Sequence, residues 1–285
     1  MKHWYDSDGR LHTTVINQAA VKRGDDNTGR NATIKDARKN GWFPGWTAIG
    51  GMLDKPALNA WKKAEFKRVM EEEPRCGDDE TWAEYWRRIE EKLRHELEKY
   101  AELGSKVHGW IEDLLDPKWE HERNEINTPW LKMFEQWRDR NVSEVIASEM
   151  TFCSPEWGYG GTIDLQYTNW QDQFAIADFK TKRTKPGEKV IQYNENKRQL
   201  VAYALGIRKI EWGVQPAAFG PEDANDSRCF FKDSFPVLGN LYLSTTEPGR
   251  WEYIEVKPEE IPNLILDVRD LTRLWQRENK FNMKG

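Results

Sequence analysis

Three strand-like segments follow one another closely between residues 144 and 182, and they limit the fold more than any other feature of the sequence. They read EVIASEMTF, GTIDLQYT and FAIADFKT, each rich in β-branched or aromatic residues and separated from the next by a polar turn. Strands this close in sequence pair with one another, and the sheet they form must bury its apolar faces against other elements. We therefore expect a sheet near the centre of the molecule, covered by helices.

Helical patterns dominate the chain upstream of these strands. The segment TWAEYWRRIEEKLRHELEKYAE carries apolar residues at helical spacing, and a second helix is predicted to begin near Gly104. A shorter helix, TIKDARKNG, has Thr33 as its predicted cap and Gly41 as its end. Downstream, the sequence predicts one helix, a further strand pair and a closing amphipathic helix. We expect residues 1–140 to form a mainly helical region and residues 141–285 the sheet-containing core, within one continuous domain.

The composition is typical of a soluble globular protein. Of the 285 residues, 38% are hydrophobic and 32% are charged, and the net charge is −5. The sequence has neither an apolar run of the about 18 residues that a membrane span needs nor the apolar core of a signal peptide, which favours a cytoplasmic protein without membrane contact. The acidic balance disfavours a protein coated in nucleic acid but permits a local basic groove. The three cysteines lie far apart, which disfavours a zinc finger or a disulfide framework.

Two aspartates occupy strand positions where an apolar residue would pack better. Asp164 lies in GTIDL and Asp178 in IADFK, and Lys180 lies on the same face of its strand as Asp178 because strand side chains alternate. In an antiparallel pair the two carboxylates would lie close together, and a divalent cation would relieve their repulsion. Oxygen ligands suit Mg²⁺ or Mn²⁺, and the lysine could position water and stabilise charge on a phosphate. The alternative is a surface cross-strand ion pair, which the apolar neighbours of Asp178 disfavour.

The ordered motifs GTIDL, IADFKTK and QLVAY resemble those of the PD-(D/E)XK nucleases, and in particular the RecB-like branch that includes phage exonucleases. In that branch a glycine precedes the first aspartate, as Gly161 does here, and a later helix carries a glutamine and a tyrosine four residues apart, as Gln199 and Tyr203 are. The segment LGSKVHGWIEDLL is similar to an upstream family motif that contains a histidine, here His108. The resemblance covers, in the family's order, residues 42–65, 100–116 and 145–205.

This resemblance implies a restriction-endonuclease-like core, in which a central mixed β-sheet is flanked by helices, below a helical N-terminal half. It implies catalytic roles for Asp164, Asp178 and Lys180. It further implies a metal site in which His108 and Glu149, the acid within IASEMTF, join the two aspartates. For His108 the alternative is a histidine packed under the sheet.

The resemblance also implies contacts with DNA. Gln199 and Tyr203 would touch the DNA backbone or the reacting strand, with ordinary helix packing as the alternative. The basic run KTKRTKPGEK begins beside this site, at Lys180, so that its cations could hold phosphates instead of forming a solvated loop. The cations expected to do so are Lys182, Arg183 and Lys185.

A metal-dependent DNA exonuclease with Mg²⁺ or Mn²⁺ is the function that this resemblance implies, encoded by a phage and used in recombination, replication or degradation of DNA. A structure-specific or restriction-type endonuclease with the same site, and a noncatalytic DNA-binding or assembly protein, remain as alternatives. DNA is the expected partner, and a phage recombination or single-strand-binding protein and a homo-oligomer are further candidates. A phage protein would act in the host cytoplasm. No iron–sulfur cluster is expected, because three scattered cysteines cannot supply the quartet that some members of the superfamily use.

Overall fold

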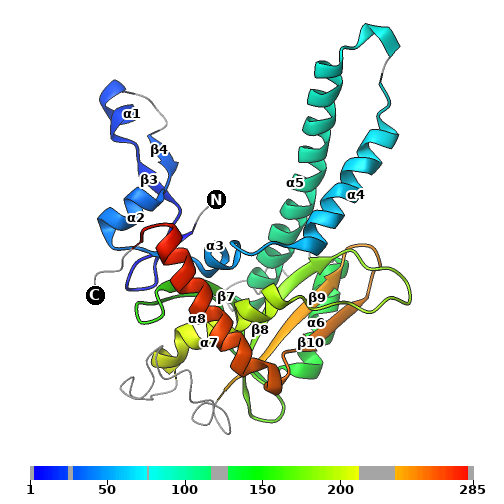
Figure 1. The fold of residues 1–285 in the computed structure, drawn as a ribbon. Helices are drawn as coiled ribbons and strands as arrows, with labels where there is room; N and C mark the ends of the chain where they lie inside the picture. The colour runs from blue at the N-terminus through cyan, green and yellow to red at the C-terminus, as the bar shows by residue number, and fades with distance from the viewer. Residues whose placement is uncertain (1–2, 25–27, 76, 117–127, 212–234, 282–285) are drawn as a thin grey trace.

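The computed structural model describes residues 3–24, 28–75, 77–116, 128–211 and 235–281, and at its centre lies a five-stranded sheet (Figure 1). The three predicted consecutive strands are confirmed as antiparallel neighbours: β6 (Glu144–Ser154), β7 (Tyr159–Thr168) and β8 (Phe174–Lys182). β9 (Val237–Ser244) lies parallel to β8, and β10 (Trp251–Glu255) pairs antiparallel with β9. The sheet has the strand order β10-β9-β8-β7-β6, and because one of its pairs is parallel and the others are antiparallel, it is mixed, as predicted.

Helices cover both faces of this sheet. On one face, α7 (Asn194–Glu211) and α8 (Ile261–Glu278) form a core with apolar sheet residues such as Ile176. On the other face, α5 (Trp82–Leu115) and α6 (Pro129–Asn141) form a second core with Leu165 and Phe179. The molecule is thus a mixed α/β structure with a central sheet between helical layers, which confirms the fold class expected from the sequence.

The side chains of β7 do not alternate regularly along the whole strand. Leu165 packs in the core under α5 and α6, whereas Ile163, two residues earlier, packs in the core with α7 and α8. Residues two apart on a regular strand face the same side. The alternation is therefore interrupted at Asp164, one of the two aspartates that the sequence marks out.

Short elements at the N-terminus lie against the end of β7. A small sheet, β2 (Leu11–His12), β1 (Trp4–Tyr5) and β5 (Phe43–Pro44), is followed by α3 (Trp46–Gly50), and Gly45 bridges to Gly160 of β7. The helix predicted after Thr33 is confirmed as α2 (Ile34–Asn40), with a capping box at Thr33 and a left-handed Gly41 at its end. The remaining short elements of this region are α1 (Gln18–Arg23), β3 (Thr14–Ile16) and β4 (Gly29–Asn31).

A long helical pair, α4 (Pro56–Glu72) and α5, projects from the body of the molecule (Figure 1). The prediction of a second helix beginning near Gly104 is wrong, because α5 runs through this position as one helix of 34 residues. A Cβ atom at residue 104 would lie 3.3 Å from Thr181 Oγ1, so the glycine lets the helix pass close to β8. The capping box at Thr81 starts this continuous helix.

Two 3₁₀ turns, Gly77–Asp79 and Pro258–Glu260, complete the described elements. Among the described helices, none combines the length and the apolar character needed to cross a membrane.

Candidate metal centre

The two predicted aspartates meet where the pairing of β7 with β8 ends. The last paired residues are Leu165 and Ala177, so Asp164 and Asp178 occupy the next position of this register. There the ladder is replaced by a side-chain contact, in which the Phe179 backbone N–H donates to Asp164 Oδ2 at 2.6 Å. Asp164 is 8% exposed and Asp178 1% exposed. The structure therefore places two acidic side chains side by side in a nearly dry environment.

Asp178 is held by two donors on the same oxygen. Lys180 Nζ lies 2.6 Å from Asp178 Oδ2, and Asn240 donates its Nδ2–H to that oxygen at 2.7 Å. The contact with Lys180 agrees with the prediction that both side chains share one face of β8. Asn240 was not predicted, although an asparagine inside the apolar strand VLGNLYLS was a usable signal. It lies directly beside Asp178 in the parallel pairing of β9 with β8 and accepts a hydrogen bond from Gln192.

His108 reaches the aspartates from α5. Its Nε2 lies 3.0 Å from the carbonyl oxygen of Phe179, and its Nδ1 lies 3.6 Å from Asp164 Oδ2. Because a carbonyl can only accept, the Nε2 atom carries a hydrogen, and Nδ1 is the ring nitrogen on the carboxylate side. Metal-ligating histidines are commonly fixed by such a contact through the other ring nitrogen. The contact with the Phe179 carbonyl therefore fixes the ring with Nδ1 next to the Asp164 carboxylate.

Glu149 of β6 completes a group of three candidate ligands. One ligand atom each from His108, Glu149 and Asp164 lie within 4.8 Å of one another. Glu149 has a φ of 48°, in the left-handed region that non-glycine residues seldom adopt. Two carboxylates and one neutral imidazole fit a divalent cation. Of the four residues predicted to form the metal site, Asp178 stands beside this group of three and bonds to Lys180 instead.

Burial and neighbouring negative charge raise the pKa of two acids in this group. Burial, followed by repulsion from Asp164, Glu112 and Asp178, raises the pKa of Glu149 to about 8. Burial, followed by repulsion from Asp178, raises the pKa of Asp164 to about 6, although His108 and Lys180 act in the opposite direction. A site whose acids resist ionisation would be stabilised by a bound cation, because the cation favours their charged forms.

Lys180 connects the acids to α7. Burial alone would lower the pKa of Lys180, but attraction to Asp178 and Asp164 exceeds this effect and raises the pKa above its usual value. Its Nζ atom also lies 3.4 Å from Gln199 Oε1, and Gln199 Nε2 donates to the Tyr203 hydroxyl at 2.7 Å. The two α7 residues singled out from the sequence thus lie next to the acidic group.

Gly161 explains how α7 comes so close. A Cβ atom at this position would lie 2.8 Å from a ring carbon of Tyr203 and 2.9 Å from a ring carbon of Phe152, which is closer than Cβ contacts allow. The glycine three residues before Asp164 therefore permits the contact between β7 and α7.

The cations of the predicted basic run do not all lie in the same place. Lys182 Nζ donates to the carbonyl oxygen of Ile191 at 3.0 Å, and Arg183 forms an ion pair of 3.0 Å with Glu65 of α4. Both line a cleft that also contains Lys180. Lys185 lies outside this lining and forms an exposed ion pair of 3.5 Å with Glu188.

Two clefts include residues of this site in their lining. The first, of about 420 Å³, is lined by Glu149, Asp164 and Tyr203 together with N-terminal residues such as Tyr5 and Thr47. The second, of about 390 Å³, is the one lined by Lys180, Lys182 and Arg183. The N-terminal segment was not predicted to reach the site, because nothing in its local pattern indicates the bridge between Gly45 and Gly160.

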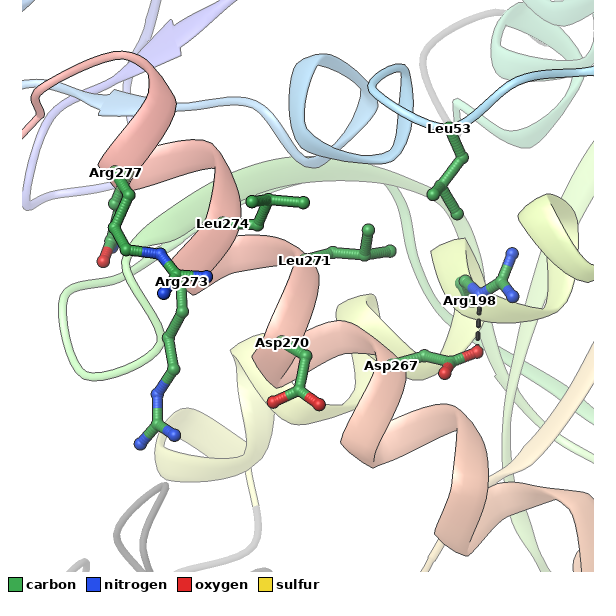
Figure 2. Close-up of a pocket in the computed structure, with 9 residues that line it drawn as sticks. Leu53, Arg198, Asp267, Asp270, Leu271, Arg273, Leu274 and Arg277 are labelled. Carbon is green, nitrogen blue, oxygen red and sulfur yellow. Dashed lines mark hydrogen bonds and ion pairs between the residues drawn. The ribbon is translucent and has the colours of Figure 1, made fainter.

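A third cleft, of about 790 Å³, lies elsewhere, along α8 (Figure 2). Leu271 and Leu274 form part of its wall, and Arg198 and Asp267 form an ion pair of 2.7 Å across it (Figure 2). None of the candidate site residues lines this cleft, so its size does not make it the functional site.

Comparisons with known proteins agree with the geometry at the level of the family. A family model described as the PD-(D/E)XK nuclease superfamily matches residues 117–285, more than half of the chain. This range contains Asp164, Asp178 and Lys180 and begins after His108. A search of curated proteins finds no match.

A solved structure described as "Crystal structure of SSO0001" is similar at 14% identity and a TM-score of 0.24. The match covers 59% of this chain and 69% of that one, and a similarity this low establishes neither the fold nor the function. The family model is the decisive match, and with the mixed sheet it supports a restriction-endonuclease-like fold and metal-dependent nuclease activity on DNA. The chain belongs to the PD-(D/E)XK nuclease superfamily.

Proposed function

We propose that this protein is a Mg²⁺- or Mn²⁺-dependent DNA exonuclease of the RecB-like type. The observation that carries the proposal is the group of His108, Glu149 and Asp164 beside the ion pair of Asp178 and Lys180. In this proposal a helical region up to residue 140 contributes His108 to a nuclease core formed by residues 141–285.

Each residue of the site has a distinct task in this proposal. His108 Nδ1, Glu149, Asp164 and, with a shifted carboxylate, Asp178 would hold the cation. The bound ion would polarise the scissile phosphate and lower the pKa of a water molecule. Lys180, positioned by Gln199, would place a positive charge where negative charge develops on the phosphate oxygens.

The two clefts support an exonuclease over an endonuclease. The cleft on the Lys180 side has four cations in its lining, whereas the cleft on the Glu149 side has no lysine or arginine among the described residues that line it. An enzyme that grips phosphates on one side of the cut fits a reaction at a strand end. A structure-specific or restriction-type endonuclease with the same site is the second candidate, and a noncatalytic DNA-binding protein is the third.

The biological setting belongs to the same proposal. The motif order that resembles phage exonucleases supports a phage enzyme of DNA recombination, replication or degradation, acting in the host cytoplasm. A phage recombination or single-strand-binding protein would be its protein partner, and a homo-oligomeric ring around DNA is the assembly to test by solution mass.

Cleavage of linear and of covalently closed circular DNA in Mg²⁺ tests this function. An exonuclease requires an end and should degrade the linear DNA while leaving the closed circle intact. Asp178→Asn should lower cleavage by about a hundredfold or more, because several kcal/mol of charge stabilisation depend on the metal that this carboxylate helps to hold.

Asp172→Asn is the matched control for this substitution. Asp172 lies in the turn between β7 and β8, at the other end of the same hairpin, and its φ of 57° suits asparagine. This variant should cut like the wild-type protein. Cleavage of the closed circle would favour the endonuclease, and wild-type cleavage by Asp178→Asn would refute the assigned site.

A further inference from the structure

The cleft on the Lys180 side has an unusual combination of side chains. It lies between α4 and α5 on one side and the ends of β8 and β9 with the start of α7 on the other. Its lining includes four aromatic residues, Trp61, Tyr100, Tyr193 and Tyr242, and four cations, Lys55, Lys180, Lys182 and Arg183. We refer to it as the aromatic cleft.

The charge of the aromatic cleft opposes that of the whole protein. Its lining holds four cations and one acidic residue, Glu195, whereas the chain carries a net charge of −5. Two of the cations, Lys180 and Arg183, are also paired with acids outside the lining, Asp178 and Glu65. Two of the cations are held in place: Arg183 by Glu65 and by the hydroxyl of Tyr100, and Lys182 by the carbonyl oxygen of Ile191. A local cluster of fixed positive charge in an acidic protein attracts phosphate groups.

The aromatic rings are placed among these cations. Lys182 Nζ lies 4.7 Å from the ring centre of Tyr193 and 5.5 Å from that of Tyr242. Across the cleft, the rings of Trp61 and Tyr100 meet edge to face at 5.4 Å, and neither residue is fully buried. Leu58, 38% exposed, adds apolar surface beside them. Rings next to phosphate-binding cations are the arrangement by which proteins stack on the bases of single-stranded nucleic acid.

We propose that the aromatic cleft binds a single DNA strand, stacking bases on Trp61 and Tyr193, and leads its backbone to Lys180 and Asp178. The inference deepens the proposed nuclease function and rests on it, since Lys180 belongs to both the cleft and the acidic group.

Two features favour a single strand over a duplex. In a duplex the base faces are covered by their neighbours, so the aromatic side chains would have nothing to stack on. The volume of about 390 Å³ is also near the lower end of the range of small-ligand sites, which suits a nucleotide or two of one strand.

The test measures binding apart from cleavage. Fluorescence anisotropy in EDTA compares a labelled single strand of about ten nucleotides with a duplex of the same length. Wild-type protein should bind the single strand more tightly. Trp61→Ala and Tyr193→Ala should each weaken single-strand binding about tenfold and leave duplex binding unchanged, whereas Trp61→Phe should restore most of the loss.

Trp170→Ala is the matched control, because Trp170 is 59% exposed in the turn between β7 and β8 and does not line the aromatic cleft. Lys182→Ala should lower the salt dependence of binding by about one unit of slope on a logarithmic plot. Melting curves accompany each variant, and if Trp61→Ala does not fold, Tyr193→Ala decides.

The outcomes separate this inference from the proposed function. If the wild-type protein cuts linear DNA but Tyr193→Ala and the Trp170 control bind the single strand equally, the aromatic cleft has no such role. Equal losses of duplex and single-strand binding in the cleft variants would also overturn it. If the variants lose single-strand binding as expected but the wild-type protein cuts no DNA, the nuclease proposal fails and the binding cleft stands.

Discussion

The carboxylate of Asp178 illustrates how single residues define this site. It is almost completely buried, and both its described donors, Lys180 and Asn240, contact the same oxygen. A buried carboxylate needs such donors, because an unpaired charge in a dry environment is costly. Lys180 has a task of its own in the proposed reaction, which leaves Asn240 as the residue that sets the orientation of Asp178.

Replacing Asn240 with leucine should therefore impair the site without unfolding the protein. The substitution keeps the number and branching of the side-chain heavy atoms, and Gln192 keeps its second acceptor, the carbonyl oxygen of Ile254. We expect cleavage to fall about ten- to a hundredfold and the Mg²⁺ requirement to rise, as is usual when a partner that orients a metal ligand is lost. Single-turnover cleavage across a Mg²⁺ titration is the measurement.

The control for Asn240→Leu removes a buried hydrogen bond far from the acids. Thr272 of α8 donates to the carbonyl oxygen of Val268 at 2.8 Å, so Thr272→Val should lower the melting temperature and leave the Mg²⁺ requirement unchanged. An unchanged Mg²⁺ requirement in Asn240→Leu would show that this residue has only a packing role.

The sequence predicts the site unevenly, for a physical reason. Asp164, Asp178 and Lys180 lie on adjacent segments, and strand alternation alone places two of them on one face. Asn240 lies 62 residues after Asp178 and reaches it through a parallel strand pair, which no local pattern encodes. Strand alternation therefore predicts the contact of Asp178 with Lys180, whereas the approach of His108 and Gln199 could be expected only from the family resemblance. The contact of Asn240 follows from neither.

Among the elements, the approach of α7 to β7 brings Tyr203 and Gln199 to the acids. Gly161 permits this approach, because a Cβ atom there would overlap the rings of Tyr203 and Phe152. The continuous α5 works in the same way on the other side, where Gly104 lies close to Thr181. A glycine inside a helical pattern indicates an end when only the sequence is considered, so the packing reason for Gly104 could not be predicted.

Gly161→Ala should consequently lower both stability and activity. Overpacking of this kind typically costs about 1–3 kcal/mol, and here the displaced ring belongs to the residue bonded to Gln199. We expect a clear drop in melting temperature and reduced cleavage at saturating Mg²⁺. Thermal unfolding followed by circular dichroism, with parallel cleavage assays, measures both effects.

Gly109→Ala is the matched control for this prediction. Gly109 lies in α5 next to His108, and a Cβ atom there would meet nothing within 4 Å. Because alanine is the better helix former, this variant should be more stable by about 0.5–1 kcal/mol. If both variants shifted the melting temperature in the same direction, close packing at Gly161 would not be the cause.

In the whole molecule, six elements place charged or polar groups around one point: α5, β6, β7, β8, β9 and α7. The acids in this group outnumber the cations, and burial, followed by repulsion from neighbouring acids, raises the pKa of Glu149 and Asp164. Holding these acids together therefore lowers the stability of the folded protein when they are ionised. That cost should be measurable as a dependence of stability on pH and on metal.

The relevant pH window follows from the shifted groups. The usual pKa of the Glu149 side chain is 4.5, and in the folded protein it is about 8, so its stabilising contribution is complete below 4.5 and disappears as the pH rises through 8. The raised pKa of Asp164, about 6, likewise lowers the stability as the pH rises toward that value. Burial lowers the pKa of His3 from its usual 6.5. Below pH 6.5 this shift makes the protein more stable as the pH rises, which opposes the effect of the two acids. Between about 6.5 and 8, Glu149 should therefore dominate.

In EDTA, the melting temperature of the protein should fall as the pH rises from 6.5 to 8, because the folded state retains a proton on Glu149 that the unfolded chain has released. Glu149→Gln should remove most of this fall, and Glu112→Gln should reduce it, because Glu112 contributes to the repulsion. Mg²⁺ should raise the melting temperature more at pH 8 than at pH 6.5, since the ion binds the ionised carboxylates in competition with protons. Equal slopes for the wild-type protein and Glu149→Gln in EDTA, or a Mg²⁺ effect independent of pH, would contradict a metal centre built on Glu149.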